Sequence, residues 1–227
     1  MKLRLIALSM IYSMFFLSLG FSETGAFFTD TAVSSNNTFT TAEEFGEGEP
    51  PASPQFGDVV INEIMWMGSA SSSADEWIEL KNMTSNDIDL TGWIIEGLGS
   101  GSNQTATVSA GVISANNFFL ISHFDENSTS SILDVVPDLL FPSIAFTNTG
   151  EEIVLKTPSG TIIDVADNSG EGWLAGDDDF PRRSMERKSP PDNGTEGSNW
   201  HNSTGQTNLD SEIQEFATPK AANSSGS

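Results

Sequence analysis

The chain has 227 residues, with 32 Asp and Glu against nine Lys and Arg, and its formal net charge is −23. This length suits one sizeable domain with shorter appendages. The absence of cysteine excludes disulfide bonds, zinc–thiolate sites, iron–sulfur clusters and cysteine nucleophiles. A chain this acidic lacks the basic face that nucleic acids and anionic lipid headgroups require. We therefore expect neither kind of partner.

Residues 1–26 have the pattern of an export signal. Lys2 and Arg4 form a short basic region, residues 5–21 are almost wholly apolar, and Thr24 and Ala26 place small residues at a cleavage site. Cleavage after Ala26 removes two basic residues and one acidic residue, which changes the net charge from −23 to −24. We predict a secreted or cell-surface protein with no membrane insertion after signal removal. Retention of the segment as an N-terminal anchor is the alternative.

Residues 25–40 read GAFFTDTAVSSNNTFT. They resemble the start of camelysin-type exported proteins, some of which build biofilm matrix fibres. In those proteins, cleavage just before an aromatic-rich segment frees an extended N-terminus. The resemblance implies export. It also raises the hypothesis of a matrix-fibre subunit in which residues 27–41 add as a strand to a neighbouring sheet edge.

Residues 27–56 are predicted to be an extended acidic linker. Its second half, TTAEEFGEGEPPASPQF, is rich in Glu and Pro and has little that could fill a core. We place one domain at residues 57–223 and a short disordered tail at residues 224–227.

Within that domain the apolar pattern is short and typical of strands. The predicted strands are residues 59–66, 76–80, 93–95, 118–121, 153–155, 161–165 and 184–187. The turn Thr157-Pro158-Ser159-Gly160 predicts a hairpin between the fifth and sixth of them. Residues 130–146 show a weak helical period, but Pro137 and Pro142 interrupt it. Many short strands separated by turns favour a β-sandwich.

Six blocks in chain order resemble a lamin tail domain. They are INEIMW (61–66), ADEWIELKN (74–82), DLTGWII (89–95), PRRSMER (181–187), NW (199–200) and ATPKAAN (217–223). The resemblance implies an all-β, immunoglobulin-like β-sandwich. Exported prokaryotic members are more similar to this chain than nuclear lamins are, because no coiled-coil rod precedes the blocks. Lys220 stands where the family commonly has Gly after Pro, a departure that concerns only the last turn.

The third block also has a physical interpretation of its own. Asp89 is expected to cap backbone N–H groups, Gly92 to take the tight position of a turn, and Trp93 to be buried. All five tryptophans, at positions 66, 77, 93, 173 and 200, fall within the proposed domain. We expect them to fill the core, with carbohydrate-stacking platforms as the alternative.

Three glutamates lie on or beside the first two predicted strands: Glu63, Glu76 and Glu79. A pair of carboxylates could serve as the acid and base of a glycosidase. Carboxylates spaced two apart on a strand more often form a solvated face or pair with arginine, and Arg182, Arg183 and Arg187 are available. We therefore predict no catalytic residues. The basic cluster from Arg182 to Lys188 is expected to pair internally with acids.

Metal and histidine chemistry have weak signals. Asp177, Asp178 and Asp179 follow a glycine, with Asp164 and Asp167 upstream. Oxygen ligands of this kind can hold Ca²⁺, but the EF-hand spacing is absent. A solvated acidic loop is the favoured interpretation, and no cofactor is predicted, with Ca²⁺ as the alternative. His123 and His201 are the two histidines. They form no zinc motif and no clear Ser-His-Asp arrangement, so both are expected to be structural.

Several N-x-[ST] sequences occur, including those at Asn82, Asn103, Asn127, Asn193 and Asn202. They would be glycosylated only in a host that has the enzymes for N-glycosylation.

Taken together, these features predict an exported, non-catalytic lamin tail module. It would act in binding, adhesion or structure at the cell surface or outside the cell, with a protein or carbohydrate partner. A matrix-fibre subunit is the alternative, followed by an accessory domain that acts with a separate hydrolase.

Overall fold

The computed structural model describes residues 53–99, 105–167 and 170–225. The predicted signal, the camelysin-like segment, most of the predicted linker and Asn103 lie outside these residues. Within the described ranges, no helix is long and apolar enough to cross a membrane.

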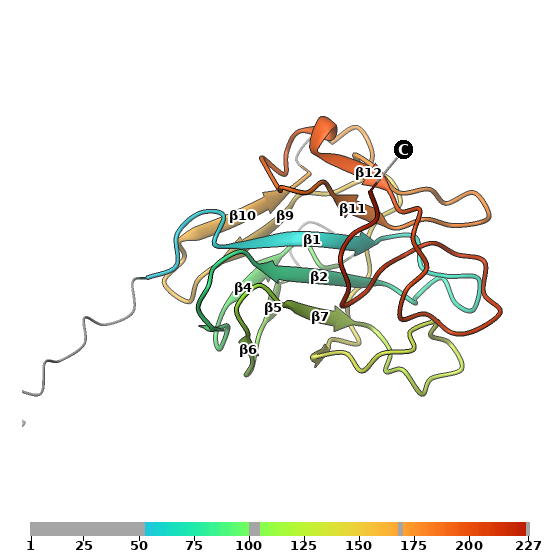
Figure 1. Cartoon of the computed structure of the whole chain (residues 1–227), viewed down its shortest axis with the longest axis horizontal. Helices are drawn as coiled ribbons and strands as arrows, with labels where there is room; N and C mark the ends of the chain where they lie inside the picture. Colours follow the sequence, from blue (N-terminus) through green and yellow to red (C-terminus); the bar gives the residue numbers. More distant parts are fainter. Residues whose placement is uncertain (1–52, 100–104, 168–169, 226–227) are drawn as a thin grey trace, which may run out of the picture. The chain divides into compact units, whose positions relative to one another are not determined.

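Short strands make up nearly all of the regular structure in this part of the chain (Figure 1). They are β1 (Val59–Met65), β2 (Trp77–Asn82), β3 (Ile88–Asp89), β4 (Ile94–Glu96), β5 (Thr105–Thr107), β6 (Val112–Ile113), β7 (Phe118–Ser122), β8 (Leu139–Leu140), β9 (Ile153–Lys156), β10 (Ile162–Ala166), β11 (Met185–Arg187) and β12 (Trp200–Asn202), with a 3₁₀ turn, η1 (Gly197–Asn199), before β12.

The seven predicted strands are confirmed as β1, β2, β4, β7, β9, β10 and β11. The predicted hairpin is also confirmed, because β9 and β10 pair antiparallel across the turn at residues 157–160. The sequence did not predict β3, β5, β6, β8 and β12. These strands have two or three residues each, too few for a period to show. The weakly helical stretch at residues 130–146 contains β8 and no helix.

Two sheets form the layers of a sandwich. One has the strand order β12-β11-β1-β2-β7-β8, and the other has the order β10-β9-β4-β5. Figure 1 views the molecule through the first sheet, with the second behind it. β3 and β6 form a separate pair. The layers meet at β1 and β10, where the Ile61 N–H donates to Asp164 Oδ2 at 2.8 Å. The all-β, immunoglobulin-like sandwich expected from the sequence is therefore present.

A β-bulge in β1 decides which side chains face outward. The pairing of β1 with β2 places Ile61 opposite Leu80, Glu63 opposite Glu79 and Ile64 opposite Ile78, with an irregularity between Ile61 and Glu63. Because side chains alternate along a strand and a bulge adds one residue, the apolar partners face the core, while Glu63 and Glu79 face the outer surface of the six-stranded sheet. All seven β1 residues are nevertheless buried, so both faces of this strand are covered.

The turn before β4 forms as its sequence predicts. Asp89 Oδ1 accepts a hydrogen bond from the Thr91 N–H at 2.8 Å. Gly92 has a φ of 78°, a conformation that glycine adopts readily, and the buried Trp93 begins the next strand segment. Each member of this block thus has the role expected from its chemistry.

The tryptophans confirm the core interpretation at four positions. Trp66, Trp77, Trp93 and Trp200 are buried, whereas Trp173 is partly buried and packs against the core. Trp173 stacks on Trp66 with ring centroids 5.8 Å apart, and Phe146 packs against it edge-on at 5.6 Å. Trp66 therefore covers one face of the Trp173 ring, which leaves that face closed to a sugar.

Two of these tryptophans are expected to respond differently to replacement by phenylalanine. The buried Trp77 Nε1 has no hydrogen-bond partner among the described residues, whereas Trp200 Nε1 donates to Gly194 O at 2.8 Å. Removing an unpaired N–H offsets part of the packing lost, so Trp77→Phe should lower the free energy of unfolding by about 1 kcal/mol or less. Trp200→Phe should lower it by about 2–3 kcal/mol. Urea denaturation of both variants measures the difference, and an equal or larger loss for Trp77→Phe would contradict it.

Candidate functional site

Three glutamates lie side by side on the outer face of the six-stranded sheet. Glu63 of β1 has Glu79 of β2 as its cross-strand partner on one side and Glu186 of β11 on the other. Directly opposed residues have Cβ atoms about 4.5–5.5 Å apart. All three side chains are fully buried. We call these three residues the glutamate row.

The end of the chain covers this row. Figure 1 shows the red C-terminal segment crossing in front of β1 and β2. Residues 218–224, here called the C-terminal strap, donate one backbone N–H to each carboxyl group. The Thr218 N–H donates to Glu63 Oε1 at 3.0 Å, the Lys220 N–H donates to Glu79 Oε2, and the Ser224 N–H donates to Glu186 Oε2 at 2.9 Å. Ser224, the first residue of the predicted tail, therefore takes part in this network.

Hydroxyl and amide groups complete the network. Ser184 Oγ donates to Glu63 Oε1 at 2.6 Å, and Asn62 Nδ2 donates to Glu79 Oε1 at 2.8 Å. Glu186 also accepts hydrogen bonds from three hydroxyl groups, those of Ser203 and Thr218 at 2.7 Å and that of Ser224 at 2.5 Å. The acids are thus solvated by the protein's own donors.

The strap contains the residue at which the sequence departs from its family pattern. Lys220 has a φ of 56°, and the Ala221 N–H donates to Thr218 O at 3.0 Å, which closes a turn with Pro219 and Lys220 at its centre. Such a turn favours glycine at its second central position, because other residues are strained there. The Lys220 Nζ lies 2.8 Å from Asp138 Oδ1, so the side chain forms an ion pair that glycine could not make.

Burial controls the protonation of the row. The pKa of Glu63 is raised to about 8, first by burial and then by the neighbouring Glu186, against the lowering effect of hydrogen bonds from Ser184 and Thr218. Burial also raises the pKa of Glu79 well above its ordinary value, and Glu63 adds to this rise. Glu63 and Glu79 therefore hold protons at neutral pH that free glutamates would have released.

This arrangement corrects the prediction for Glu63 and Glu79. They form neither a solvated face nor arginine pairs, because the strap covers the sheet where the sequence pattern suggests solvent. Glu76 is also buried, and its Oε2 accepts a hydrogen bond from the Phe146 N–H at 3.1 Å. The sequence interpretation missed Glu186 and the strap donors. The family block at residues 217–223 marked the strap but gave no sign of its acceptors.

Arg187 pairs with an acid on the opposite face of the sheet. Arg187 and Asp164 form a buried ion pair, with Nη2 3.1 Å from Oδ1. Arg187 also donates to Ile61 O at 3.2 Å and to Asp192 O at 2.5 Å. Burial raises the pKa of Asp164 despite the lowering effect of Arg187. The predicted pairing of the basic cluster with acids is confirmed for Arg187 and for Arg182, whose Nε lies 3.2 Å from Asp178 Oδ1. Arg183 instead donates to Ser203 O at 2.8 Å and lies over the Phe216 ring.

The remaining candidates do not converge. His123 follows β7 and His201 lies in β12, two strands separated by β2, β1 and β11 in the sheet. The His123 ring contacts Ile144 O at 3.1 Å, and the His201 ring contacts Asn202 O at 2.9 Å. Asp164 pairs with Arg187 and does not join residues 177–179 in a common metal site. Among the described residues, no three His, Asp or Glu side chains are grouped so as to hold a metal ion.

The N-x-[ST] sequences have different surroundings. Asn82 is buried, and its amide donates to Asn86 O, Ile113 O and Ser114 O at 2.7–3.2 Å, so its side chain is committed to the fold. Asn127, Asn193 and Asn202 are exposed.

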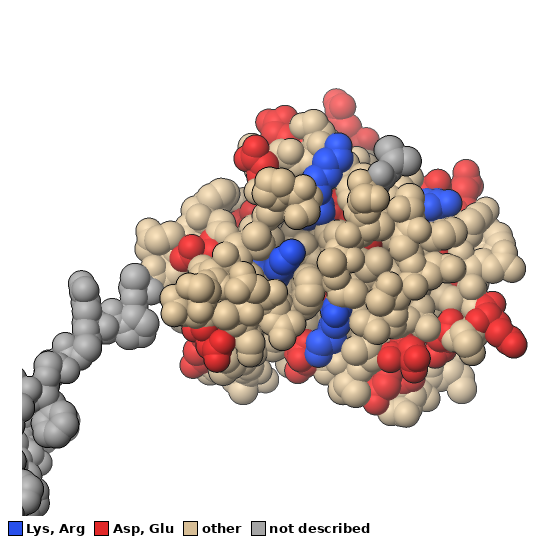
Figure 2. Space-filling view, in the orientation of Figure 1, with Lys and Arg blue, Asp and Glu red and all other residues tan. Residues whose placement is uncertain are grey.

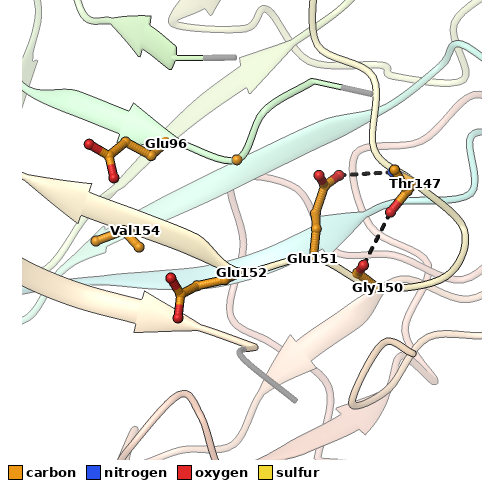
Figure 3. Close-up of a pocket in the computed structure, with 7 residues that line it drawn as sticks. Glu96, Thr147, Gly150, Glu151, Glu152 and Val154 are labelled. Carbon is orange, nitrogen blue, oxygen red and sulfur yellow. Dashed lines mark hydrogen bonds between the residues drawn. The ribbon is translucent and has the colours of Figure 1, made fainter. Parts of the chain in front are cut away.

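A surface hollow of about 370 Å³ lies beside the end of β4 (Figure 3). Its lining residues are Glu96, Gly97, Thr147, Gly150, Glu151, Glu152 and Val154. Glu96 Oε2 lies 2.6 Å from Lys156 Nζ, and Glu151 Oε1 accepts a hydrogen bond from the Thr147 N–H at 2.8 Å. Burial raises the pKa of Glu151. The hollow offers carboxyl groups to solvent, but two of the three already have partners in the fold.

Two packed antiparallel-rich sheets with a buried tryptophan core define an immunoglobulin-like β-sandwich. The lamin tail domain model matches residues 52–169, just over half of the chain, and the protein belongs to the lamin tail domain family. The matched range contains the first three sequence blocks. β11, β12 and the strap lie beyond it but continue or cover the sheet that β1 and β2 begin. A comparison with curated proteins gave no match.

Proposed function

We propose that this protein is an exported, non-catalytic lamin tail module that binds a partner at the cell surface or outside the cell. The family consists of immunoglobulin-like, non-enzymatic domains, which is compatible with a binding or structural role. The partner would be a protein or a carbohydrate.

One observation carries this proposal. The buried acids that might have served in catalysis accept hydrogen bonds from the chain's own backbone and hydroxyl groups, as Glu63 and Glu186 do. Catalytic acids need an open side that a substrate can reach. Polar groups used in this way hold a scaffold in shape. The acidic groups gathered at the rim of the face in Figure 2 would keep such a scaffold soluble outside the cell.

Export is tested with the full chain and a variant that lacks residues 5–21. We expect secreted protein whose first residue is Phe27, and retention of the variant inside the cell. N-terminal sequencing and fractionation measure both. Full-length protein held in the membrane fraction would contradict cleavage and favour the anchor.

Binding is tested separately with fluorescently labelled mature protein on producing cells. We expect saturable retention. Prior periodate treatment of the cells should abolish it if the partner is a carbohydrate, and prior protease treatment should abolish it if the partner is a protein. A lack of saturable retention would overturn the binding role. Polymers visible by electron microscopy, and lost when residues 27–41 are deleted, would favour the matrix-fibre alternative.

A further inference from the structure

We propose that the C-terminal strap is a pH-gated clasp: it closes over the glutamate row in acid and lifts locally in alkali, while the sandwich beneath it stays folded. The clasp does not depend on the binding role proposed above.

The hydrogen bonds between the strap and the row all run from strap donors to carboxyl acceptors. Each glutamate of the row accepts one strap amide, so the hydrogen bonds that hold the strap down converge on three carboxyl groups. Further contacts hold the strap outside the row: Asn208 Nδ2 donates to Pro219 O at 2.8 Å, the Lys220 ammonium pairs with Asp138, and Asn223 is another anchor. Its Nδ2 donates to Asn62 O at 3.0 Å and to Arg187 O at 2.7 Å. The charge state of the row therefore acts directly on the strap.

Few positively charged groups surround the row. In the sheet, Lys81 of β2 lowers the pKa of Glu79, but its ammonium lies over the Phe118 ring, 5.3 Å from the centroid. His201 of β12 has Nδ1 3.7 Å from Glu186 Oε2. Arg187 is committed to Asp164 on the inner face. In the strap, the Lys220 ammonium pairs with Asp138. Just before the strap, the buried Glu215 accepts a hydrogen bond from the Ala70 N–H and is a further acid.

The row can hold one negative charge more easily than two or three. The site has enough hydrogen-bond donors to stabilise one carboxylate, because four hydrogen bonds converge on Glu186 alone. A second and a third buried charge on adjacent strands repel one another and the first, and no cation among the groups named above balances them. Exposure to water relieves this repulsion.

The strap can move without the rest of the fold. It covers one face of the sheet, whereas the apolar partners of β1 and β2 face the other sheet. Before the strap, Phe216 and Ala217 form bridges to Arg183 and Gln206, which would hold its base in place. Proteins open locally, in segments that can detach without exposing the apolar core, at a free-energy cost well below that of global unfolding.

The test is amide hydrogen exchange, corrected for the intrinsic base-catalysed rate, in the mature protein. The amides of Thr218, Lys220 and Ser224 should lose protection by at least about tenfold between about pH 6 and about pH 9. The amides of the β1–β2 ladder should keep their protection. An equal loss in both groups would mean global unfolding and would overturn the clasp, as would a strap whose protection does not change.

Two matched variants separate the row from other acids. Glu63→Gln keeps the shape of the protonated acid and should preserve strap protection at about pH 9. Glu76→Gln removes a buried carboxyl group that does not contact the strap, and should leave the loss as it is in the parent protein. If strap protection falls equally in Glu63→Gln, the row is not the gate. Should Glu63→Gln fold poorly, the comparison of strap and ladder amides in the parent protein still decides.

Discussion

Replacing Arg187 by methionine is expected to lower the free energy of unfolding by about 3–5 kcal/mol. The change leaves the buried Asp164 without its counter-charge, since the two side chains form a bidentate pair at 3.1 and 3.2 Å. It also leaves Ile61 O and Asp192 O without their donor and removes the guanidinium that lies 4.8 Å from the centre of the Trp200 ring. One side chain thus links β1, β10, β11 and the loop before η1.

Urea denaturation monitored by tryptophan fluorescence measures this loss. Arg182→Met is the matched control. Its ion pair with Asp178 is half-exposed and its Nη1 also donates to Ser69 O, so its removal should cost about 1–2 kcal/mol, less than that of Arg187. The double variant Asp164→Leu/Arg187→Met should recover part of the stability, because no buried charge remains unpaired. A loss for Arg187→Met as small as that of the control would show that the pair does not join the sheets.

The sandwich could be predicted because its inner face is continuous and apolar. Ile78 and Leu80 alternate with Trp77 and Glu79, and the turn residues Asp89 and Gly92 have clear local chemistry. The spacing of carboxylates on the strands suggested that Glu63 and Glu79 form a solvated face or pair with arginine. Nothing in β1 or β2 reveals the cover, because Glu63 meets Thr218 across 155 residues of sequence.

The ion pairs illustrate the same limit. The charge balance of the chain predicted that its few basic residues would find acids, and Arg187 did. The choice of Asp164 depends on how two sheets pack, since the pair joins a residue of β11 to one of β10. Glu186 lies in a strand of three residues, too short for any pattern to place it on the outer face. Local patterns therefore predicted the elements, while the glutamate row required the tertiary structure.

Stability is expected to fall as pH rises through the neutral range, the reverse of ordinary acid denaturation. The pKa values of Glu63 and Glu76 are raised to about 8 and that of Asp75 to about 6, in each case chiefly by burial. A folded state with raised carboxyl pKa values binds more protons than the unfolded chain between about pH 4.5 and about pH 8. The stabilisation that these acids give is therefore complete below that window and lost as pH rises through it.

For Glu63 the lost free energy is on the order of a few kcal/mol. The predicted net charge of the mature chain acts in the same direction, because ionising buried acids adds to repulsion in a chain that is already acidic. Urea denaturation at several values from about pH 5 to about pH 9 measures the trend. Added salt screens surface repulsion but acts little on buried groups, so a slope that persists in salt belongs to the buried acids. Glu63→Gln should flatten the upper part of the curve, because its amide has no proton to lose in this range. A stability that rises with pH in salt would mean that these carboxyl groups are already ionised in the fold, and the protonated glutamate row would then be wrong.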